Sequence, residues 1–593
     1  MKYTDFFIKR PVLSTVVGLL ILLLGVQGFS TLTVRELPKI ENTVITVTTV
    51  YPGAPQELVQ GSITRPIQTA MASAEGIDYL SSTSLPSKSQ IQAYIELDHD
   101  PNAALAEIMS KVAEVQDQLP QDAQQPLVKK QTGSKIATFY VGFYSDTMNA
   151  EQITEYLNRV VRPLFETVAG VGRVDVRGCS SYAMRVWLNP QAMAARQITP
   201  KQVFQALKNN NYEAVAGQID GDFTVASITA QTTMNTPEQF GELVVGESGN
   251  TLIRIKDVAK VELGSRSYDS EVFVRGRPAV ALQVEHRAGT NPLTVIDTLE
   301  GMLPAMTAQM PEGLQYEILL DQTTFIRDSN RELTFTLFLT AGIVVFVIFL
   351  FMGSFRAALI PAISISLSLV GVTFCMEAMG FSLNQLTLLA MVLAIGLIAD
   401  DVIVVLENVQ RHIDEARSPY TAAILGAREI AAPVTVMTLT LAAVFAPMGL
   451  LGGPSGVLFS ELAFTLAGLV VISGVIALTL SPMMSSRFLE SGDKPRMQLL
   501  AERIFDEVRA RYERGLHDVL HHRPVVLLLA AVLLASIPIL LLNTPVELAP
   551  AEDKGIIMGQ GTAPMYANID YTTKYTADAV ELFADVPENE LTF

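Results

Sequence analysis

Seven apolar runs of membrane-spanning length restrict the fold of this 593-residue chain more than any other feature. The first extends from Val12 to Phe29, follows Lys9 and Arg10, and at about 18 residues is long enough to cross the hydrocarbon core of a bilayer. Backbone groups in lipid must be satisfied within their own segment, so each run is expected to form a helix. The other six runs lie at about 333–352, 358–379, 384–406, 432–451, 459–486 and 525–542.

Basic residues predict how these helices are oriented. Arg356, Arg411 and Arg428 lie in alternate connections, whereas the opposite loops at 379–384 and 451–458 contain no Lys or Arg. The positive-inside rule places the basic connections in the cytoplasm. No A-x-A-like cleavage site follows the first run, so it is predicted to be an uncleaved span with a cytoplasmic N-terminus. Residues 33–331 then lie outside. In a bacterium with two membranes this places them in the periplasm and makes the chain a multi-pass protein of the inner membrane.

Composition excludes several functional classes. A net charge of −18 argues against a nucleic-acid partner, which requires a basic surface. Two cysteines cannot form a disulfide framework or a four-sulfur metal site. The histidines show no metal-ligand spacing, and no P-loop, nucleophile elbow or HExxH motif is present. We therefore predict no enzyme activity, no cofactor and no bound metal.

The segment between the first two spans predicts α+β lobes. Residues Gln90 to Leu97 alternate between apolar and polar side chains, as in a half-buried strand, and Asp100 with Pro101 then starts an amphipathic helix. The same order of strand, helix and strand recurs at 137–177 and 279–320. Split β-α-β units of the ferredoxin-like type fit this order. Residues 179–270 differ in pattern and are interpreted as an inserted subdomain, so the predicted fold class is an α+β membrane protein.

An internal repeat predicts that a second copy of the same series of elements begins near the end of this chain. The pair Arg10-Pro11 recurs as Arg523-Pro524, and the segment 35–38 recurs as 546–550, at an offset of about 512 residues. Residues 546–593 are then expected to begin a further lobe with one strand and one helix, a second strand being left open. We accordingly expect a protein roughly twice as long as this chain, which stops inside the second repeat.

Two adjacent carboxylates, Asp400 and Asp401, lie well inside the fourth apolar run. Burying one charged carboxylate near mid-membrane costs about 2.5–3.5 kcal/mol even on insertion scales. Three other acids, Glu377, Glu407 and Glu461, lie near the ends of spans and are expected to reach water. The aspartate pair is therefore the main candidate for chemistry within the membrane.

Two interpretations of the pair remain open. In the functional one, Asp400 and Asp401 form a proton relay, lining one interhelical seam that Gly396 allows to pack closely. In the alternative, they belong to a static buried ion pair. No span holds a central Lys or Arg, so a cationic partner is expected from the second repeat.

Six motifs together resemble the resistance-nodulation-division superfamily, and within it the hydrophobe/amphiphile efflux transporters of Gram-negative bacteria. The motifs are FFIKRP, TVYPGAPQELVQGSITRPIQ, GVGRVDVRG, SYAMRVWLNP, SFRAALIP and GLIADDVIVVLENVQRHI. The resemblance implies a homotrimer in the inner membrane lipid bilayer, driven by proton influx. It further implies a periplasmic membrane-fusion adaptor and an outer-membrane channel as partners, and export of amphiphilic substrates from the periplasm or outer leaflet.

The resemblance also assigns residues. Asp400 and Asp401 fall on the proton-relay aspartates of the family, whose lysine, arginine and threonine partners belong to later helices. Where related drug pumps place aromatic pocket residues, this chain has Ile136 or Ala137 and Arg177. A cation in place of rings would suit anionic or amphiphilic substrates, although these residues could equally be packing variants.

The expected division of the chain follows from the spans and the resemblance. The segment 487–523 includes an amphipathic stretch, 497–520, that would lie on the membrane surface or serve as a solvated linker. The expected segments are 1–32 (tail and first span), 33–133 (first porter subdomain), 134–178 and 271–331 (second porter subdomain), 179–270 (docking subdomain), 332–486 (spans two to six), 487–523 (cytoplasmic linker), 524–543 (seventh span) and 544–593 (start of a third porter subdomain).

The sequence is compatible with three functions. The leading one is a proton/substrate antiporter that exports amphiphilic or hydrophobic compounds. A metal-ion exporter of the same superfamily is the nearer alternative, and the paired aspartates favour the first over it. A transport-incompetent, half-length scaffold subunit is the third.

Overall fold

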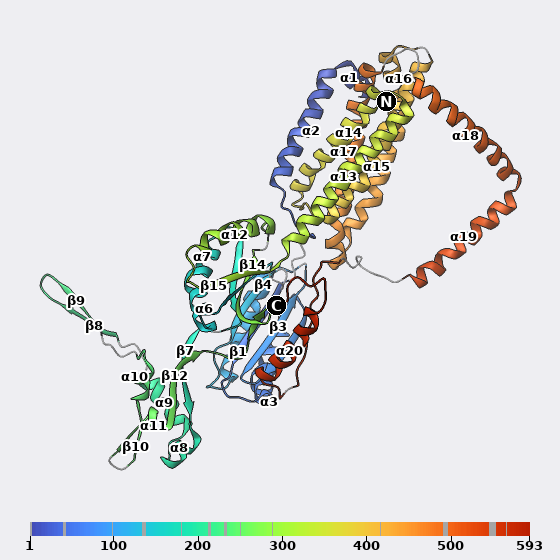
Figure 1. Cartoon of the computed structure of the whole chain (residues 1–593). Helices are drawn as coiled ribbons and strands as arrows, with labels where there is room; N and C mark the ends of the chain where they lie inside the picture. The colour runs from blue at the N-terminus through green and yellow to red at the C-terminus, as the bar shows by residue number, and fades with distance from the viewer. Residues whose placement is uncertain are drawn as a thin grey trace. The chain divides into compact units, whose positions relative to one another are not determined.

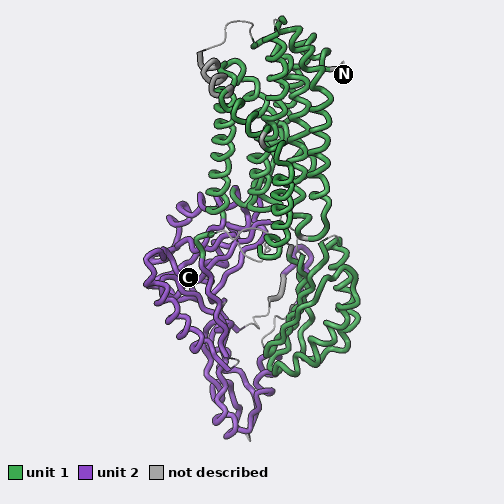
Figure 2. The backbone as a smooth tube through the Cα atoms, turned by 90° about the vertical axis from the view of Figure 1, so that its right-hand side faces the viewer, with its two compact units in different colours: residues 1–135, 288–293, 323–556 green, residues 136–287, 294–322, 557–593 purple. Residues whose placement is uncertain are grey.

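The computed structural model divides the chain into two units, each described here by itself (Figure 2). Unit 1 comprises residues 1–135, 288–293 and 323–556, and unit 2 comprises residues 136–287, 294–322 and 557–593. The residues that the structure describes are 3–38, 43–97, 99–132, 138–179, 181–210, 215–229, 234–248, 251–287, 289–415, 417–489, 496–544, 553–564 and 566–593.

Unit 1 contains a four-stranded antiparallel sheet with the strand order β2-β3-β1-β4. Side chains that alternate along β3, such as Ile91 and Ala93, are buried against the helices, and Asp100 caps α5 by accepting a hydrogen bond from the amide of Asn102. This order of strands and helices is that of a ferredoxin-like lobe. Its elements are β1 (Thr43–Val50), α3 (Gln56–Val59), η1 (Gln60–Thr64), α4 (Arg65–Met71), β2 (Ile77–Leu85), β3 (Lys88–Ile95), α5 (Pro101–Glu114), η2 (Gln116–Gln118) and β4 (Leu127–Thr132).

Unit 2 contains a second lobe of the same topology. Strand β14 pairs with β5, β6 and β13, and β5 also pairs with β15, all antiparallel. One face of this sheet is apolar, with Val174 and Leu282 buried in the same core as residues of α6 and α12. The elements are β5 (Phe139–Ser145), α6 (Ala150–Tyr156), η3 (Leu157–Val161), α7 (Arg162–Glu166), β6 (Val171–Arg177), β13 (Val272–Val274), β14 (Arg277–His286), α12 (Pro292–Thr307) and β15 (Leu314–Asp321).

A separate group of short elements is inserted between β6 and β13. Strand β7 pairs antiparallel with β12, β10 with β11, and β8 with β9. The amide of Gln202 donates to Thr199 Oγ1 at the start of α9, as in a capping box. The elements are β7 (Tyr182–Leu188), α8 (Pro190–Ala195), α9 (Pro200–Asn210), β8 (Val215–Asp220), β9 (Val225–Thr229), α10 (Pro237–Gly241), β10 (Val244–Ser248), β11 (Thr251–Arg254), α11 (Ile255–Val258) and β12 (Ala259–Ser265).

Seven of the described helices are long and apolar enough to cross a membrane: α2, α13, α14, α15, α16, α17 and α19. Figure 1 shows α2 and α13 to α17 running side by side, and α14, α15 and α17 are the most buried of the seven. Several extend beyond the predicted apolar runs because their polar end turns stay helical. Their bounds are α1 (Tyr3–Lys9), α2 (Pro11–Thr31), α13 (Thr323–Met352), α14 (Phe355–Ala378), α15 (Gln385–Asp414), α16 (Pro419–Phe445), η4 (Ala446–Leu450), α17 (Gly453–Phe488), α18 (Arg496–His521) and α19 (Arg523–Asn543).

The C-terminal segment departs from the expected strand and helix. Helix α20 (Ile569–Ala584) forms, but the described residues 553–564 contain no strand. A strand is defined by hydrogen bonds to a neighbouring strand, and this segment is not paired in a ladder. Instead the amide of Arg275 donates to the carbonyl of Thr592 over 3.1 Å, and Leu591 packs beside Val274 and Leu319 on the sheet of unit 2.

Candidate functional site

Helix α15 carries Asp401 near its middle and buries it. Asn384 caps the helix by accepting a hydrogen bond from the amide of Thr387 at 3.0 Å, which fixes where the helix begins. Asp401 is 1% exposed, and Ser473 Oγ of α17 donates to its Oδ2 over 2.9 Å. Its Oδ1 has no hydrogen-bond partner among the described residues. One oxygen of a buried carboxylate is thus satisfied and the other is free.

Asp400 does not share the environment of Asp401. It is exposed on the outer surface of α15, because successive residues on a helix point about 100° apart and only Asp401 turns toward α17. Among the described helices only Asp401 lies in an interhelical contact, and the expectation that both carboxylates line one seam stays a prediction. Gly396 lies on the same outer surface, and apart from its own stretch of helix no described atom lies within 4 Å of the position that a Cβ would take there. The expected close helix contact at Gly396 is not formed by the described part of the chain.

Apolar side chains surround Asp401 within the bundle. Ile398, Val402 and Val405 of α15 are fully buried. A Cβ added at Gly474, the neighbour of Ser473, would lie 2.5 Å from Thr438 Oγ1 of α16, which brings α16 close to α17 at this level. An ionised carboxylate in such surroundings is costly unless it is paired. Asp401 is therefore suited to binding and releasing a proton, or to pairing with a cation from another segment.

The expectation that Glu461 reaches water is wrong, because this residue of α17 is only 6% exposed. Its Oε2 accepts hydrogen bonds from Asn384 Nδ2 at 2.6 Å, Ser382 Oγ at 3.1 Å and the amide of Ser382 at 3.2 Å. These bonds fasten the connection between α14 and α15 to α17. Sequence reasoning missed this site, although the capping asparagine at the start of α15 was a usable signal.

Helix α1 is held to the end of α16 by an ion pair. Arg428 Nε donates to Asp5 Oδ1 over 2.8 Å, and a second guanidinium nitrogen contacts Asp5 Oδ2. The carboxylate of Asp5 is buried. The hydrogen bonds from Arg428 hold the pKa of Asp5 below its ordinary value, against the opposing effect of burial.

The predicted substrate residue Arg177 lies at the end of β6, on the face of the sheet opposite the helices. Its side chain is 55% exposed, and its Nε donates to Gln283 Oε1 of β14 over 2.9 Å. Asp175 Oδ2 lies 2.9 Å from Arg173 Nε and 3.5 Å from Arg177 Nη2. Because side chains alternate along a strand, these charges form a ladder on one face. The other predicted pocket residues, Ile136 and Ala137, lie outside the described residues.

A carboxylate of β14 completes this ladder. Glu285 is paired in register with Arg173. Burial raises the pKa of Glu285 above its ordinary value, while Arg173 and Arg177 oppose that rise. The face therefore combines two arginines with two acids, so a negatively charged ligand approaching Arg177 would compete with Asp175 for it.

The spans and the buried aspartate define a multi-pass membrane protein. A family model described as the AcrB/AcrD/AcrF family matches residues 3–593, and the chain belongs to this family. The motif-based prediction of the resistance-nodulation-division superfamily is thereby confirmed. The chain is 42% identical over 589 residues to an uncharacterized transporter of Haemophilus influenzae (strain ATCC 51907 / DSM 11121 / KW20 / Rd). That alignment covers 99% of this chain and 57% of the relative, so the chain spans little more than half the length of that protein.

Proposed function

We propose that this protein is a proton/substrate antiporter of the inner membrane that exports amphiphilic or hydrophobic compounds. The observation that carries the proposal is Asp401, a carboxylate buried near the middle of a membrane-spanning helix with one oxygen bonded to Ser473 and the other free. Intramembrane carboxylates facing a bundle interior typically serve ion or proton pathways. Membership in a transporter family supports the same function.

In this mechanism Asp401 gains a proton from the periplasmic side and loses it toward the cytoplasm. Protonation removes the charge and with it the cost of burying the carboxylate, so the two states favour different packings of α15 against α17. Asp400 faces the uncovered surface of α15, where a cation from a further helix would reach it. The proposed source of that cation is a second repeat of the same plan.

Each part of the chain has a role in this mechanism. The two ferredoxin-like lobes are porter subdomains in the periplasm, and the insertion at 179–270 is a docking subdomain. Helix α18 lies along the cytoplasmic face. The protein acts as a homotrimer with a periplasmic membrane-fusion adaptor and an outer-membrane channel. Arg177, half-exposed on its sheet face, would favour substrates that carry a negative charge.

Efflux from cells that lack competing pumps tests this proposal. Asp401→Asn removes the titrating group while keeping the size of the side chain, and should abolish export of dyes and detergents. Glu407→Gln changes an exposed carboxylate on the same helix and should leave export unchanged. Export by Asp401→Asn at the wild-type rate would defeat the proposal. Resistance to copper, silver or zinc salts instead of detergents would point to the metal-exporting alternative.

A further inference from the structure

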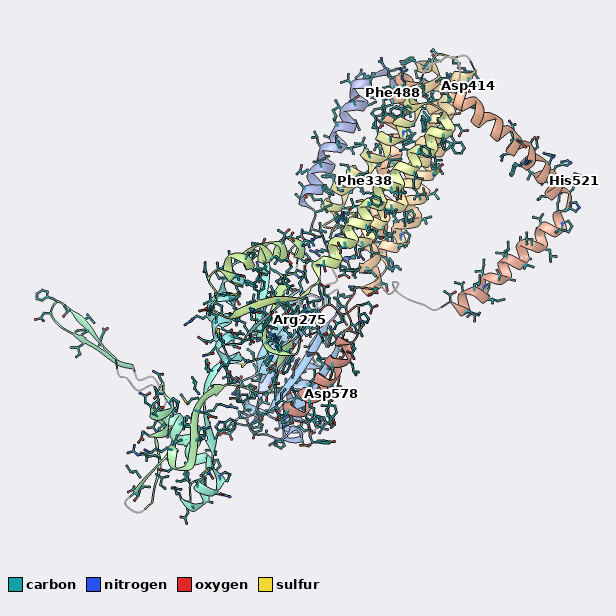
Figure 3. The ribbon with its side chains drawn as sticks, viewed as in Figure 1. Arg275, Phe338, Asp414, Phe488, His521 and Asp578 are labelled. Atoms are coloured by element: carbon teal, nitrogen blue, oxygen red, sulfur yellow. The ribbon has the colours of Figure 1, made fainter. Side chains whose placement is uncertain are left out.

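A buried histidine near the C-terminal end of α15 lies between two carboxylates. His412 has a side chain that is 5% exposed, with Nδ1 3.2 Å from Glu415 Oε2 and Nε2 3.1 Å from Glu429 Oε2 of α16. Both glutamate side chains are about half-exposed. Figure 3 labels Asp414, the last residue of α15, at the same end of the bundle as Phe488, the last residue of α17. The histidine is thus covered from water by two carboxylates.

Hydrogen-bond counting shows what each form of the His412 ring can donate. An ionised carboxylate only accepts hydrogen bonds, and neutral imidazole carries an N–H on one nitrogen only. Both contacts of His412 are satisfied together when the ring carries a proton on each nitrogen, as imidazolium. The two carboxylates lie on opposite nitrogens and so cannot chelate one metal ion with the ring, and no metal-binding group is found among the described residues.

The neighbouring charges are balanced around this ring. Glu429 Oε2 also lies 2.8 Å from Arg411 Nη2 and accepts from Asn408 Nδ2 at 3.2 Å. Glu415 Oε2 lies 3.6 Å from Arg417 Nη2. Two acids and two arginines cancel, so the cluster is neutral with imidazole and carries one positive charge with imidazolium. Other charged groups among the described residues at this end include Asp5 and Lys9 of α1, Arg10, Arg428 of α16, Arg487 of α17, Arg356 of α14, and Glu407 and Asp414 of α15, of which Asp5 and Arg428 are paired with each other.

The position of His412 relates it to Asp401. The two are eleven residues apart, which is close to three helical turns and roughly 16 Å along α15. They therefore lie on the same side of the helix, together with Val405 and Asn408. Val405 is fully buried, whereas Asn408 already contacts Glu429. The polar side chains of Asn408 and His412 thus follow one another on this side of the helix, and the apolar Val405 lies between Asn408 and Asp401.

We propose that His412, together with Glu415 and Glu429, is the site that releases protons to the cytoplasm after they leave Asp401. This inference rests on the proposed antiport and on the cytoplasmic orientation of this end of α15. The imidazolium gives one N–H proton to water beside the exposed carboxylates. The neutral ring then accepts one proton from Asp401 through water, when the helices part at Val405. One proton enters and one leaves, so the ring returns to its starting state.

Proton flux into liposomes distinguishes this role from a static ion pair. The full-length protein is reconstituted with the pH dye pyranine, and the periplasmic side is made acidic. His412→Gln and His412→Arg should each lower proton flux at least about tenfold, a lower bound for lost proton-transfer catalysis. Arginine keeps the positive charge and can donate to both carboxylates, but it cannot release its proton. Wild-type flux in His412→Arg would overturn the proposal, because a static pair would tolerate that change.

Chemical rescue provides a test that does not depend on how the arginine packs. His412→Ala should regain flux when millimolar imidazole is added and should not respond to guanidinium, which stays protonated at this pH and so cannot take up and release a proton in turn. Absence of imidazole rescue in a correctly folded His412→Ala protein would also overturn the proposal. Folding is checked by size-exclusion chromatography, and Nile red binding should stay at the wild-type affinity. His517→Arg, at an exposed position of α18, is the matched control and should keep full flux.

The same assay separates this inference from the function on which it rests. If Asp401→Asn stops flux while His412→Arg conducts normally, only the release site is wrong. If Asp401→Asn itself conducts normally, the antiport proposal fails.

Discussion

Ser473 Oγ donates a 2.9 Å hydrogen bond to Asp401 Oδ2, while Asp401 Oδ1 has no partner among the described residues. The two residues come from different helices, α17 and α15, so a proton gained or lost by Asp401 acts directly on the contact between those helices. A hydroxyl can donate to an ionised carboxylate and can also accept from a protonated one. Ser473 can therefore keep a hydrogen bond to Asp401 in both protonation states of the carboxyl group.

The first prediction concerns Ser473. Ser473→Ala should slow transport about tenfold without abolishing it, because a hydrogen bond to a charged group is worth about 1.5–3 kcal/mol and the carboxyl group itself remains. Ser473→Thr should restore most of the rate. Ser460→Ala removes a hydroxyl on the same helix that donates to the carbonyl of Val457, within its own turn, and should have no effect. Equal losses in both alanine variants would show that Ser473 has no special role.

The second prediction concerns Glu461. Glu461→Ala removes the acceptor of the buried Ser382 amide and hydroxyl, which costs about 1–3 kcal/mol per unsatisfied group, and one of the acceptors of Asn384 Nδ2. The variant should lose several degrees of thermal stability in detergent, measured by the temperature at which the size-exclusion peak halves. Glu407→Ala, an exposed carboxylate, should melt with the wild type. A wild-type melting temperature for Glu461→Ala would mean that the clamp contributes nothing.

The third prediction concerns pH. Arg428 lowers the pKa of Asp5 in the folded state below the unfolded value of about 3.9. The pair therefore stabilises the protein above that value, and this stabilisation disappears as the pH falls through the lower folded pKa. Asp5→Asn should melt a few degrees below wild type at neutral pH, with the gap closing toward pH 3. A gap that widens in acid would contradict this assignment.

The fourth prediction concerns substrate charge. Arg177→Ala removes the half-exposed guanidinium from the face shared by β6 and β14, and should reduce export of anionic detergents such as deoxycholate several-fold more than export of neutral dyes. Arg277→Ala removes an exposed arginine of β14 whose carboxylate partner, Asp146, is 3.9 Å away. It should not change the ratio between the two substrates. An unchanged ratio in Arg177→Ala would favour the packing interpretation of this residue.

Much of the fold could be predicted because local patterns suffice for it. A long run of apolar residues predicts a helix in lipid independently of the rest of the chain, because the backbone must form its hydrogen bonds within the segment. Alternation and a capping residue located β3 and α5 to within a few residues. The described residues after the seventh span contain helix α20 and no strand, since pairing with a distant partner decides whether an extended segment becomes a strand.

The sequence by itself determined the membrane spans, the order of elements in both ferredoxin-like lobes, the family, and the presence of two acids inside one helix. Only the tertiary structure decided that Asp401 is buried against Ser473 while Asp400 is exposed, that Glu461 is a buried acceptor, and that His412 lies between two carboxylates. The physical reason is that spacing along a helix fixes which residues share a face. Which face becomes buried, and what meets it there, depends on neighbouring helices that are dozens of residues away in sequence.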